Sequence, residues 1–486
     1  MRVVVIGSGF GGLASAIRLA ARGHQVHLLE ACDQIGGRAQ TVQLGSVACD
    51  MGPTVITAPY LFAELFALAG ERLEEAVTIQ PLKQPWYRFQ FAGGDSYDYG
   101  AANEFEQTIR QHFPGDLEGY RALRAHAAKL YTTGYEQLAG TSFDRIGVML
   151  RHLPDIIRLG GYRSVDGLVR RYIRSDRLAQ MLSTAPLLLG GNPKTASSLY
   201  FLIHELEQRH GVHYVKGGTM ALVRALGALA ARLGVVVETG RHVTGFRMNK
   251  ERIHEVICQS GQHYPADSVI FGGDAATLYR KLIPPMHQSP LTRLRAHYHA
   301  PSMGLMVVYF TTRRRYDMLA HHTIGFSASY TGVLQDIFSS TRLPQDFSFY
   351  LHRPAASDPE ACPPDTDLYY VLVPVPALVR HETSEEDYQL YRDHILRVLE
   401  ERLMPGLRSQ LLHVSHVSPR YFRDTLKSHA GAGFSLQPTL TQSAWFRFHN
   451  RDPRIANLYL CGAGTHPGAG LPGVLHSAKI VESLVE

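Results

Sequence analysis

Residues 3–12 read VVVIGSGFGG, an apolar run that ends in a glycine-rich turn. Small apolar residues continue from Leu13 to Ala20, and a second apolar run, 25–29, ends at Glu30. A strand, a glycine turn and a helix in this order present backbone N–H groups and a helix N-terminus to a pyrophosphate. The segment therefore predicts an α/β fold that begins with a dinucleotide-binding unit.

The individual residues of this segment have distinct expected roles. Gly7, Gly9, Gly11 and Gly12 are predicted to cradle the pyrophosphate, with Gly7 in the tight turn and Gly12 allowing the helix and strand to pack closely. Glu30 lies 18 residues after Gly12 and ends the second strand, where a carboxylate accepts hydrogen bonds from an adenosine ribose.

Length and composition are those of an ordinary globular protein. The 486 residues are 45% hydrophobic and 19% charged, which suffices for two or three domains. No run of 18 uncharged apolar residues predicts a transmembrane helix. The five cysteines form neither a CxxC motif nor a zinc-ligand spacing, so neither a disulfide framework nor a metal site is expected. No signal-peptide pattern precedes the first strand, so we expect a protein on the cytoplasmic side.

The net charge of +6 raises the question of an anionic partner. No nucleic-acid recognition motif accompanies the charge, so nucleic acid is not expected. Residues 145–177 hold eight arginines and three acidic residues among many apolar ones. This pattern is typical of a helix lying on an anionic membrane surface, although a solvated helix with an ordinary core stripe gives the same pattern.

The order of apolar runs and turns indicates a discontinuous first domain. Residues 1–75, 215–290 and 450–486 are assigned to a Rossmann-type nucleotide-binding domain. Residues 76–115, expected as short strands, and 291–449 are assigned to a substrate domain built on a mixed β-sheet. Residues 116–214 are predicted to be a helical region that faces the membrane.

Three motifs narrow the class of protein. Gly36-Gly37-Arg38 follows Glu30, DMGPTVIT spans 50–57, and NLYLCGAGTHPGAGLPGV spans 457–474. Together they closely resemble the bacterial phytoene desaturases of the carotenoid pathway, which are flavoprotein oxidoreductases of the amine-oxidase type, and the resemblance runs nearly end to end. One departure is Ala58, which precedes Pro59 where that family usually has aspartate.

The resemblance implies FAD as the cofactor and assigns residues to it. Arg38, beside Gly37, is expected to neutralise phosphate charge, and the backbone of Val243 to meet the adenine. Gly464 and Thr465 begin the terminal turn near the flavin. Gly473 and Val474 begin a helix whose N-terminus stabilises negative charge on the reduced ring.

Few polar catalytic residues are expected, because a hydrocarbon offers a side chain no polar group to bind. His466 and Asp50 are weak catalytic candidates; a loop-bonding histidine and a structural strand-end acid are the competing interpretations. The His321-His322 pair lacks a third ligand at metal spacing in the sequence, so no metal site is predicted.

The implied reaction is the successive dehydrogenation of 15-cis-phytoene to lycopene, with hydride passing to the flavin and a proton lost. Such a polyene dissolves in lipid, which favours a peripheral membrane protein on the cytoplasmic face, re-oxidised by a quinone or oxygen. The alternatives are another polyene such as 4,4'-diapophytoene, an isomerase, an amine oxidase, or a non-enzymatic prenyl-lipid carrier on the same fold.

Overall fold

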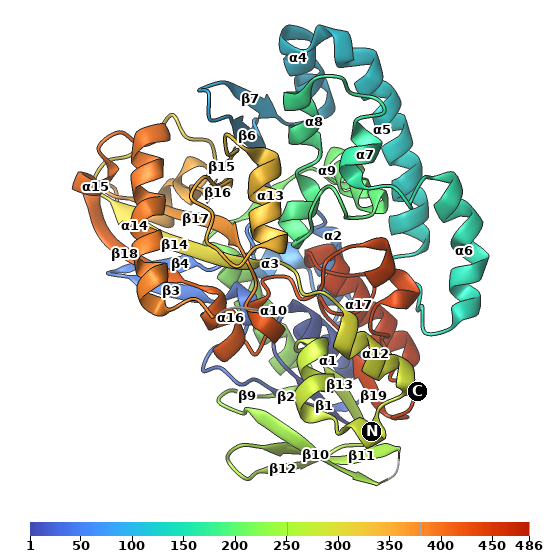
Figure 1. The fold of residues 1–486 in the computed structure, drawn as a ribbon. Coiled ribbons are helices and arrows are strands. Elements are labelled where there is room, and N and C mark those ends of the chain that lie inside the picture. The colour runs from blue at the N-terminus through green and yellow to red at the C-terminus, as the bar shows by residue number, and fades with distance from the viewer. Residues whose placement is uncertain (250, 380–381, 486) are drawn as a thin grey trace.

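The first of two large sheets is parallel and five-stranded, and it lies in the part of the molecule that holds both termini (Figure 1). A computed structural model describes residues 1–249, 251–379 and 382–485. The strand order is β19-β13-β1-β2-β9, and neighbouring strands are parallel. The strands are β1 (Arg2–Ile6), β2 (Gln25–Leu29), β9 (Val236–Glu238), β13 (Ser268–Phe271) and β19 (Leu458–Leu460). The sheet therefore joins segments from the beginning, middle and end of the chain.

Helices from the same three segments surround this sheet. Helix α1 (Phe10–Ala21) packs against α17 (Leu471–Leu484) and α10 (Thr219–Arg232). Val3 and Val5 are fully buried, as expected for a parallel strand covered on both faces. A small antiparallel sheet extends beyond the main sheet and consists of β10 (Val243–Asn249), β11 (Arg252–Cys258) and β12 (His263–Pro265).

A second, seven-stranded sheet has the order β18-β14-β17-β16-β15-β6-β7. It is mixed, because β15 and β6 are parallel and the other pairs are antiparallel. Its strands are β6 (Tyr87–Gln90), β7 (Ser96–Tyr99), β14 (Gly304–Thr312), β15 (His322–Gly325), β16 (Phe349–His352), β17 (Asp367–Val375) and β18 (Leu411–Val417). Helices α13 (Tyr330–Ser339) and α14 (Glu385–Arg402) pack on it.

A large cavity touches both sheets, and a helical region forms another part of its wall (Figure 1). It contains α4 (Ala102–His112), α5 (Leu117–Tyr131), α6 (Ile146–Arg158), α7 (Val165–Val169), α8 (Asp176–Leu182) and α9 (Leu202–His210). The remaining described strands, and the remaining described α-helices of four or more residues, are β3 (Thr41–Leu44), β4 (Val47–Asp50), α2 (Tyr60–Ala67), α3 (Leu73–Ala76), β5 (Ile79–Pro81), β8 (His213–Val215), α12 (Pro290–Tyr298), α15 (Leu407–Gln410) and α16 (Pro419–Asp424).

The mixed α/β architecture agrees with the sequence prediction, with one local difference. Residues 76–115, expected as short strands, also contain helix α4. Phe105 and Ile109, four residues apart, are both fully buried on one face of that helix, so helical periodicity holds where strands were expected. Within the described ranges, no helix is both long and apolar enough to cross a membrane.

Candidate functional site

One large cavity connects the glycine turn of the first sheet with the face of the second sheet. Its volume is about 760 Å³, and most of its wall is apolar. The turn after β1 lies at one end, and side chains of the helical region lie at the other. The cavity has room for an extended group that spans both domains.

At the turn end, the backbone is open toward the cavity. Gly7 adopts a φ of +93°, a left-handed conformation that favours glycine. A side chain at Gly9 would meet no atom within 4 Å, so this glycine leaves space that a bound group can fill. Helix α1 starts here without a capping side chain from the described residues, and its first N–H groups remain available to an anion.

Glu30 holds this turn in place. Its carboxylate accepts hydrogen bonds from the Ser8 backbone N–H at 2.8 Å, from the Ser8 hydroxyl at 2.6 Å and from the Cys32 backbone N–H at 2.9 Å. Glu30 is buried and lines the cavity. The predicted ribose acceptor therefore also organises the glycine loop.

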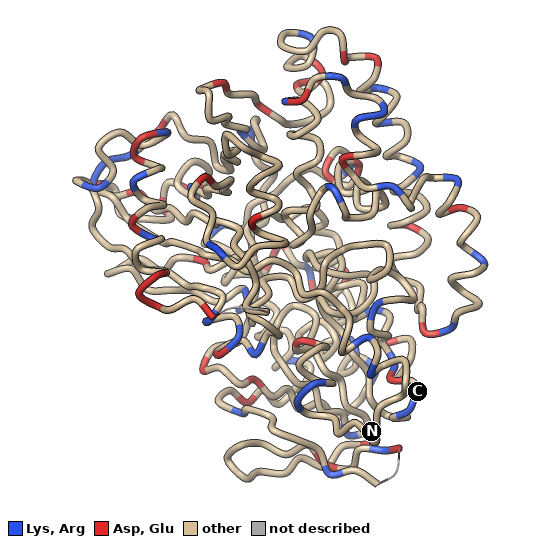
Figure 2. Tube along the Cα trace, viewed as in Figure 1, with Lys and Arg blue, Asp and Glu red and all other residues tan. Residues whose placement is uncertain are grey.

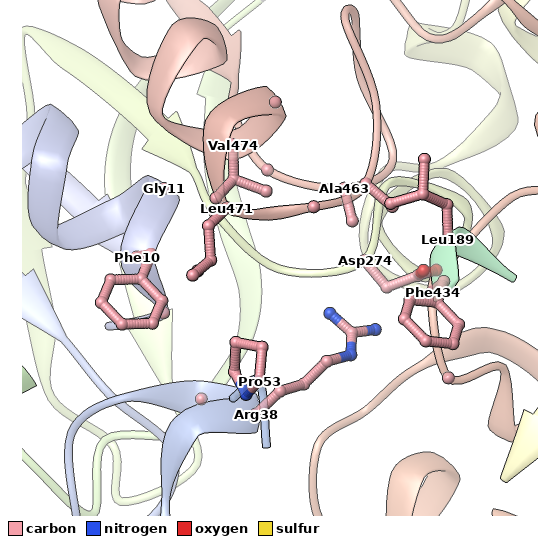
Figure 3. A pocket seen from close by; sticks show the side chains of 18 of the residues that line it. Phe10, Gly11, Arg38, Pro53, Leu189, Asp274, Phe434, Ala463, Leu471 and Val474 are labelled. Atoms are coloured by element: carbon pink, nitrogen blue, oxygen red, sulfur yellow. The ribbon is translucent and has the colours of Figure 1, made fainter. Parts of the chain in front are cut away.

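Arg38 crosses the middle of the cavity wall. Figure 3 shows its guanidinium group aimed into the space between Leu471 and Val474 on one side and Asp274 on the other. Among the described residues, the Arg38 side chain donates one hydrogen bond, from Nη2 to the Ser428 hydroxyl at 3.3 Å, and its buried Nε has no partner. Burial lowers the pKa of Arg38, although the Asp274 carboxylate acts in the opposite direction. No carboxylate of the described residues forms an ion pair with this buried cation, so an anionic ligand would stabilise it further.

A second helix N-terminus faces the same space. Helix α17 begins after Gly470 without a capping side chain from the described residues. Gly473 and Val474, in its first turn, line the cavity, and Val474 is seen in Figure 3. A Cβ at Gly473 would lie 2.5 Å from the Gly468 carbonyl oxygen, so this turn admits only glycine without movement.

Most of the predicted cofactor residues meet at this cavity. Those that line it are Gly7, Gly9, Gly11, Glu30, Gly37, Arg38, Val243, Gly473 and Val474. Gly12, Gly464 and Thr465 lie behind its wall. A Cβ at Gly12 would lie 1.9 Å from the Gly7 carbonyl oxygen, and the Thr465 hydroxyl donates to the Gly462 carbonyl oxygen. Those three residues thus shape the turns, and their neighbours face the cavity.

The site fits a flavin cofactor, because it offers two uncapped helix N-termini, a buried guanidinium without an ion-pair partner among the described residues, and an open glycine loop. The helix ends and Arg38 suit its phosphates and its electron-rich ring, and Glu30 suits its ribose.

The two weak catalytic candidates have structural partners. Asp50 accepts hydrogen bonds from the backbone N–H groups of Thr219 and Met220, at 2.5 and 3.2 Å, and so caps α10. Burial raises the pKa of Asp50 to about 6. His466 lines the cavity, but its Nε2 is 2.9 Å from the Leu138 carbonyl oxygen, and burial lowers its pKa to about 4. Both environments match the structural interpretations.

The apolar end of the cavity contains a carboxyl group that sequence analysis missed. Glu207, on α9, is buried and lines the cavity. The hydroxyls of Tyr87 and Tyr99 donate to it at 2.9 and 3.1 Å. Burial raises the pKa of Glu207 to about 7, although these two hydrogen bonds act in the opposite direction. No local motif marks Glu207, because its partners come from the distant strands β6 and β7.

The basic stretch 145–177 divides into two parts. On α6, Leu150 is 59% and Ile157 54% exposed. The residues that immediately precede them in the sequence, Met149 and Ile156, are buried. From Val165 onward, the apolar side chains belong to the core; these are Val165, Leu168, Val169 and Ile173. In its second half the stretch therefore has the core stripe named above as the alternative, and a membrane-facing surface stays a prediction, with α6 as the part that exposes apolar side chains.

The cavity, the two helix N-termini and the paired sheets define a flavoprotein oxidoreductase. The family model described as flavin containing amine oxidoreductase matches residues 10–481, and the chain belongs to this family. Among solved structures, a redesigned putrescine oxidase is similar with a TM-score of 0.67 and 15% identity, covering 99% of this chain and 98% of that one. The protein is therefore an oxidoreductase with a flavin cofactor, as predicted.

Curated relatives narrow the class further. The chain is 43% identical over 490 residues to the lycopene-forming phytoene desaturase of Pseudescherichia vulneris, covering all of this chain and 99% of the relative. It is 35% identical to the neurosporene-forming phytoene desaturase of Rhodobacter capsulatus, covering all of this chain and 94% of that one. The resemblance drawn from residues 36–38, 50–57 and 457–474 is confirmed.

Proposed function

We propose that this protein is an FAD-dependent desaturase that converts 15-cis-phytoene to lycopene by successive dehydrogenations. The observation that carries this proposal is one continuous, mostly apolar cavity that begins at the glycine turn and continues to Glu207. A long hydrocarbon fits such a wall. Identity of 43% over the full chain to a lycopene-forming relative supports this substrate over shorter polyenes.

In this proposal, FAD occupies the turn end of the cavity. Gly7, Gly9 and Gly11 and the first turn of α1 receive the pyrophosphate, and Glu30 accepts from the ribose. Arg38 neutralises phosphate charge, and the N-terminus of α17 stabilises the anionic side of the flavin. When bound, the flavin supplies the hydride acceptor that a hydrocarbon substrate requires.

Glu207 is proposed as the proton acceptor. Each new double bond requires a hydride to leave one carbon and a proton to leave its neighbour. An ionised carboxylate in an apolar wall stabilises positive charge that develops on the polyene and then takes that proton. A pKa of about 7 keeps Glu207 ionised in part of the molecules at neutral pH and still basic enough to accept.

The membrane is proposed as the source of the substrate. Ile156 of α6 lines the cavity, whereas the adjacent Ile157 is exposed, so one helix separates the chamber from the outside. Arg145, Arg151 and Arg158 lie along the same projecting helix, and Figure 2 shows basic residues there. Exposed apolar side chains beside arginines favour an anionic lipid surface. We place the protein at the cytoplasmic face of the membrane, with a quinone or oxygen re-oxidising the flavin.

The test is incubation of the purified protein with FAD and phytoene in anionic liposomes, with and without a quinone, followed by chromatography with absorbance detection. Lycopene as the end product is expected. Unchanged phytoene in the presence of bound FAD would contradict the proposed substrate, and conversion of 4,4'-diapophytoene alone would replace it. Failure to bind FAD would instead favour a prenyl-lipid carrier.

A further inference from the structure

Three histidines meet at the ends of two neighbouring strands, away from the turn end of the cavity. His322 begins β15 and pairs with His352, which ends β16. His321 precedes β15 and packs against both rings, with centroid distances of 4.5 and 4.7 Å. One ring nitrogen from each residue lies within 4.8 Å of the others, and all three residues are buried.

We propose that His321, His322 and His352 bind a transition-metal ion, Zn²⁺ in the first place. The sequence suggested no third ligand for the His321-His322 pair, because His352 lies 30 residues further along the chain. Antiparallel pairing of β15 with β16 brings it opposite His322. The argument for this site does not rest on the proposed desaturation.

The hydrogen bonds of these rings leave nitrogens unpaired. His321 Nδ1 and His322 Nε2 are buried and have no hydrogen-bond partner among the described residues. A buried polar atom without a partner is unfavourable by about 1–3 kcal/mol. Because Nε2 of His321 faces His352, the unpaired nitrogen that a shared ion would bind is His322 Nε2, and it points to a ligand that accepts an electron pair from nitrogen.

The existing contacts already resemble those around a metal. Nε2 of His352 and Nε2 of His321 are 3.1 Å apart. Two nitrogens bound to one zinc at about 2.0–2.1 Å in tetrahedral geometry lie about 3.4 Å apart, close to the separation of this pair. The separations within the cluster reach 4.8 Å, so ion binding would also draw the third ring inward. The Tyr350 hydroxyl lies 2.6 Å from His322 Nδ1, a contact of the kind that orients a metal-binding imidazole from behind.

The donor set indicates the kind of ion. Burial lowers the pKa of all three histidines, which keeps the rings neutral and their lone pairs available. Three imidazoles suit Zn²⁺, Cu²⁺ or Ni²⁺ and do not suit Ca²⁺ or Mg²⁺, which prefer oxygen ligands. A second cavity of about 330 Å³, lined by His321, Asp317 and Arg353, provides a route for the ion and space for a water as the fourth ligand.

The test starts from untagged, flavin-loaded protein purified from zinc-supplemented medium and dialysed against metal-free buffer. Metal content is measured by mass spectrometry. We expect about one zinc per chain in the wild type and at least a tenfold lower content in His352→Gln and His321→Gln. His126→Gln is the matched control, because both nitrogens of His126 already have partners, the Tyr172 hydroxyl and the Leu159 carbonyl oxygen. It should keep the full content.

A second measurement does not depend on the folding of a variant. Wild-type protein prepared from metal-depleted medium is titrated with Co²⁺ alone, which gives visible absorption bands when bound in a tetrahedral nitrogen site. Saturation at one Co²⁺ per chain, with displacement by Zn²⁺, is the expected result. Substoichiometric zinc together with no cobalt spectrum would overturn the proposal, as would zinc content that is equal in all variants.

Discussion

Glu207 is the residue on which the proposed chemistry depends most directly. It is a buried carboxyl group in a mostly apolar cavity, held by two tyrosine hydroxyls. Its environment differs from that of Glu205 two residues earlier, whose carboxylate pairs with Arg209 at 2.8 Å and which does not line the cavity. Glu207 is therefore the glutamate of α9 proposed to act in the reaction, whereas Glu205 stabilises the helix through its ion pair with Arg209.

Glu207→Gln is expected to lower the turnover number by about 10²–10⁴-fold, because the amide cannot accept the proton. In the wild type, the turnover number should rise as the pH increases through about 7, since the carboxylate is the active form, and level off above it. The variant should lose this pH dependence while keeping the flavin spectrum. Product formation under saturating phytoene measures both quantities.

Glu205→Gln is the control for this experiment and should keep both the rate and its pH profile. A Glu207→Gln enzyme with wild-type turnover, or with the same pH profile at a reduced rate, would show that another group takes the proton.

At the scale of elements, α10 is notable for its cap and α6 for its exposed apolar side chains. Helix α10 starts at a glycine, Gly218, and receives its cap from Asp50 on β4. Helix α6 projects from the molecule with apolar side chains on both of its faces (Figure 1). The first helix is stabilised by a distant carboxylate, and the second exposes apolar area that water does not favour.

Asp50→Ala is expected to lower the free energy of unfolding by about 1–3 kcal/mol, because two backbone N–H groups of α10 lose their acceptor. Asp50→Asn keeps one acceptor oxygen and should lose less. Denaturant unfolding of the flavin-loaded proteins measures the difference. Equal stability of the wild type and the alanine variant would contradict the capping role.

Leu150→Ser combined with Ile157→Ser is expected to weaken binding to anionic liposomes by about tenfold or more, since each exposed apolar side chain contributes about 1.5–3 kcal/mol when it leaves water. Co-sedimentation measures binding. Leu390→Ser on α14, 70% exposed in the wild type, is the matched control and should leave binding unchanged. If α6 does not contact lipid, the double variant will bind like the control.

At the scale of the whole molecule, one cofactor would contact segments that are hundreds of residues apart. Gly9, Val243 and Val474 all line the same cavity and belong to the beginning, middle and end of the chain. A ligand that binds only when the three segments are assembled stabilises the folded state over the unfolded one. The stability of the protein should therefore depend on its flavin.

FAD at about 100 times its dissociation constant is expected to add about 2.7 kcal/mol, which raises the Tm of flavin-free protein by a few degrees. Arg38→Met should require a higher FAD concentration for the same shift in Tm, because the variant lacks the guanidinium group that is expected to bind a phosphate. Thermal unfolding at graded FAD concentrations checks this. A Tm that does not respond to FAD would contradict the cofactor assignment.

Local motifs allowed the first sheet and most of the cofactor end to be predicted. The glycine turn, Glu30 and Arg38 lie within one short segment whose spacing carries the information. Glu207 and His352 were not predicted, because their partners are distant in the sequence. Tyrosines of β6 and β7 donate to Glu207, and the pairing of β15 with β16 places His352 opposite His322. Gly464 and Thr465 were expected at the cavity from their motif, but sequence spacing does not tell which residues of a tight turn face inward.

The consecutive residues Ile156 and Ile157 face opposite environments, the first inside the chamber and the second outside α6. If lipid covers that outer face, the polyene need never enter water, because one helix separates the bilayer from the chamber that leads to the flavin. The rate then follows the mole fraction of substrate in the bilayer, and diluting the vesicles with substrate-free lipid slows turnover although the total amount of polyene is unchanged. The substrate would then reach the enzyme by lateral diffusion within the bilayer.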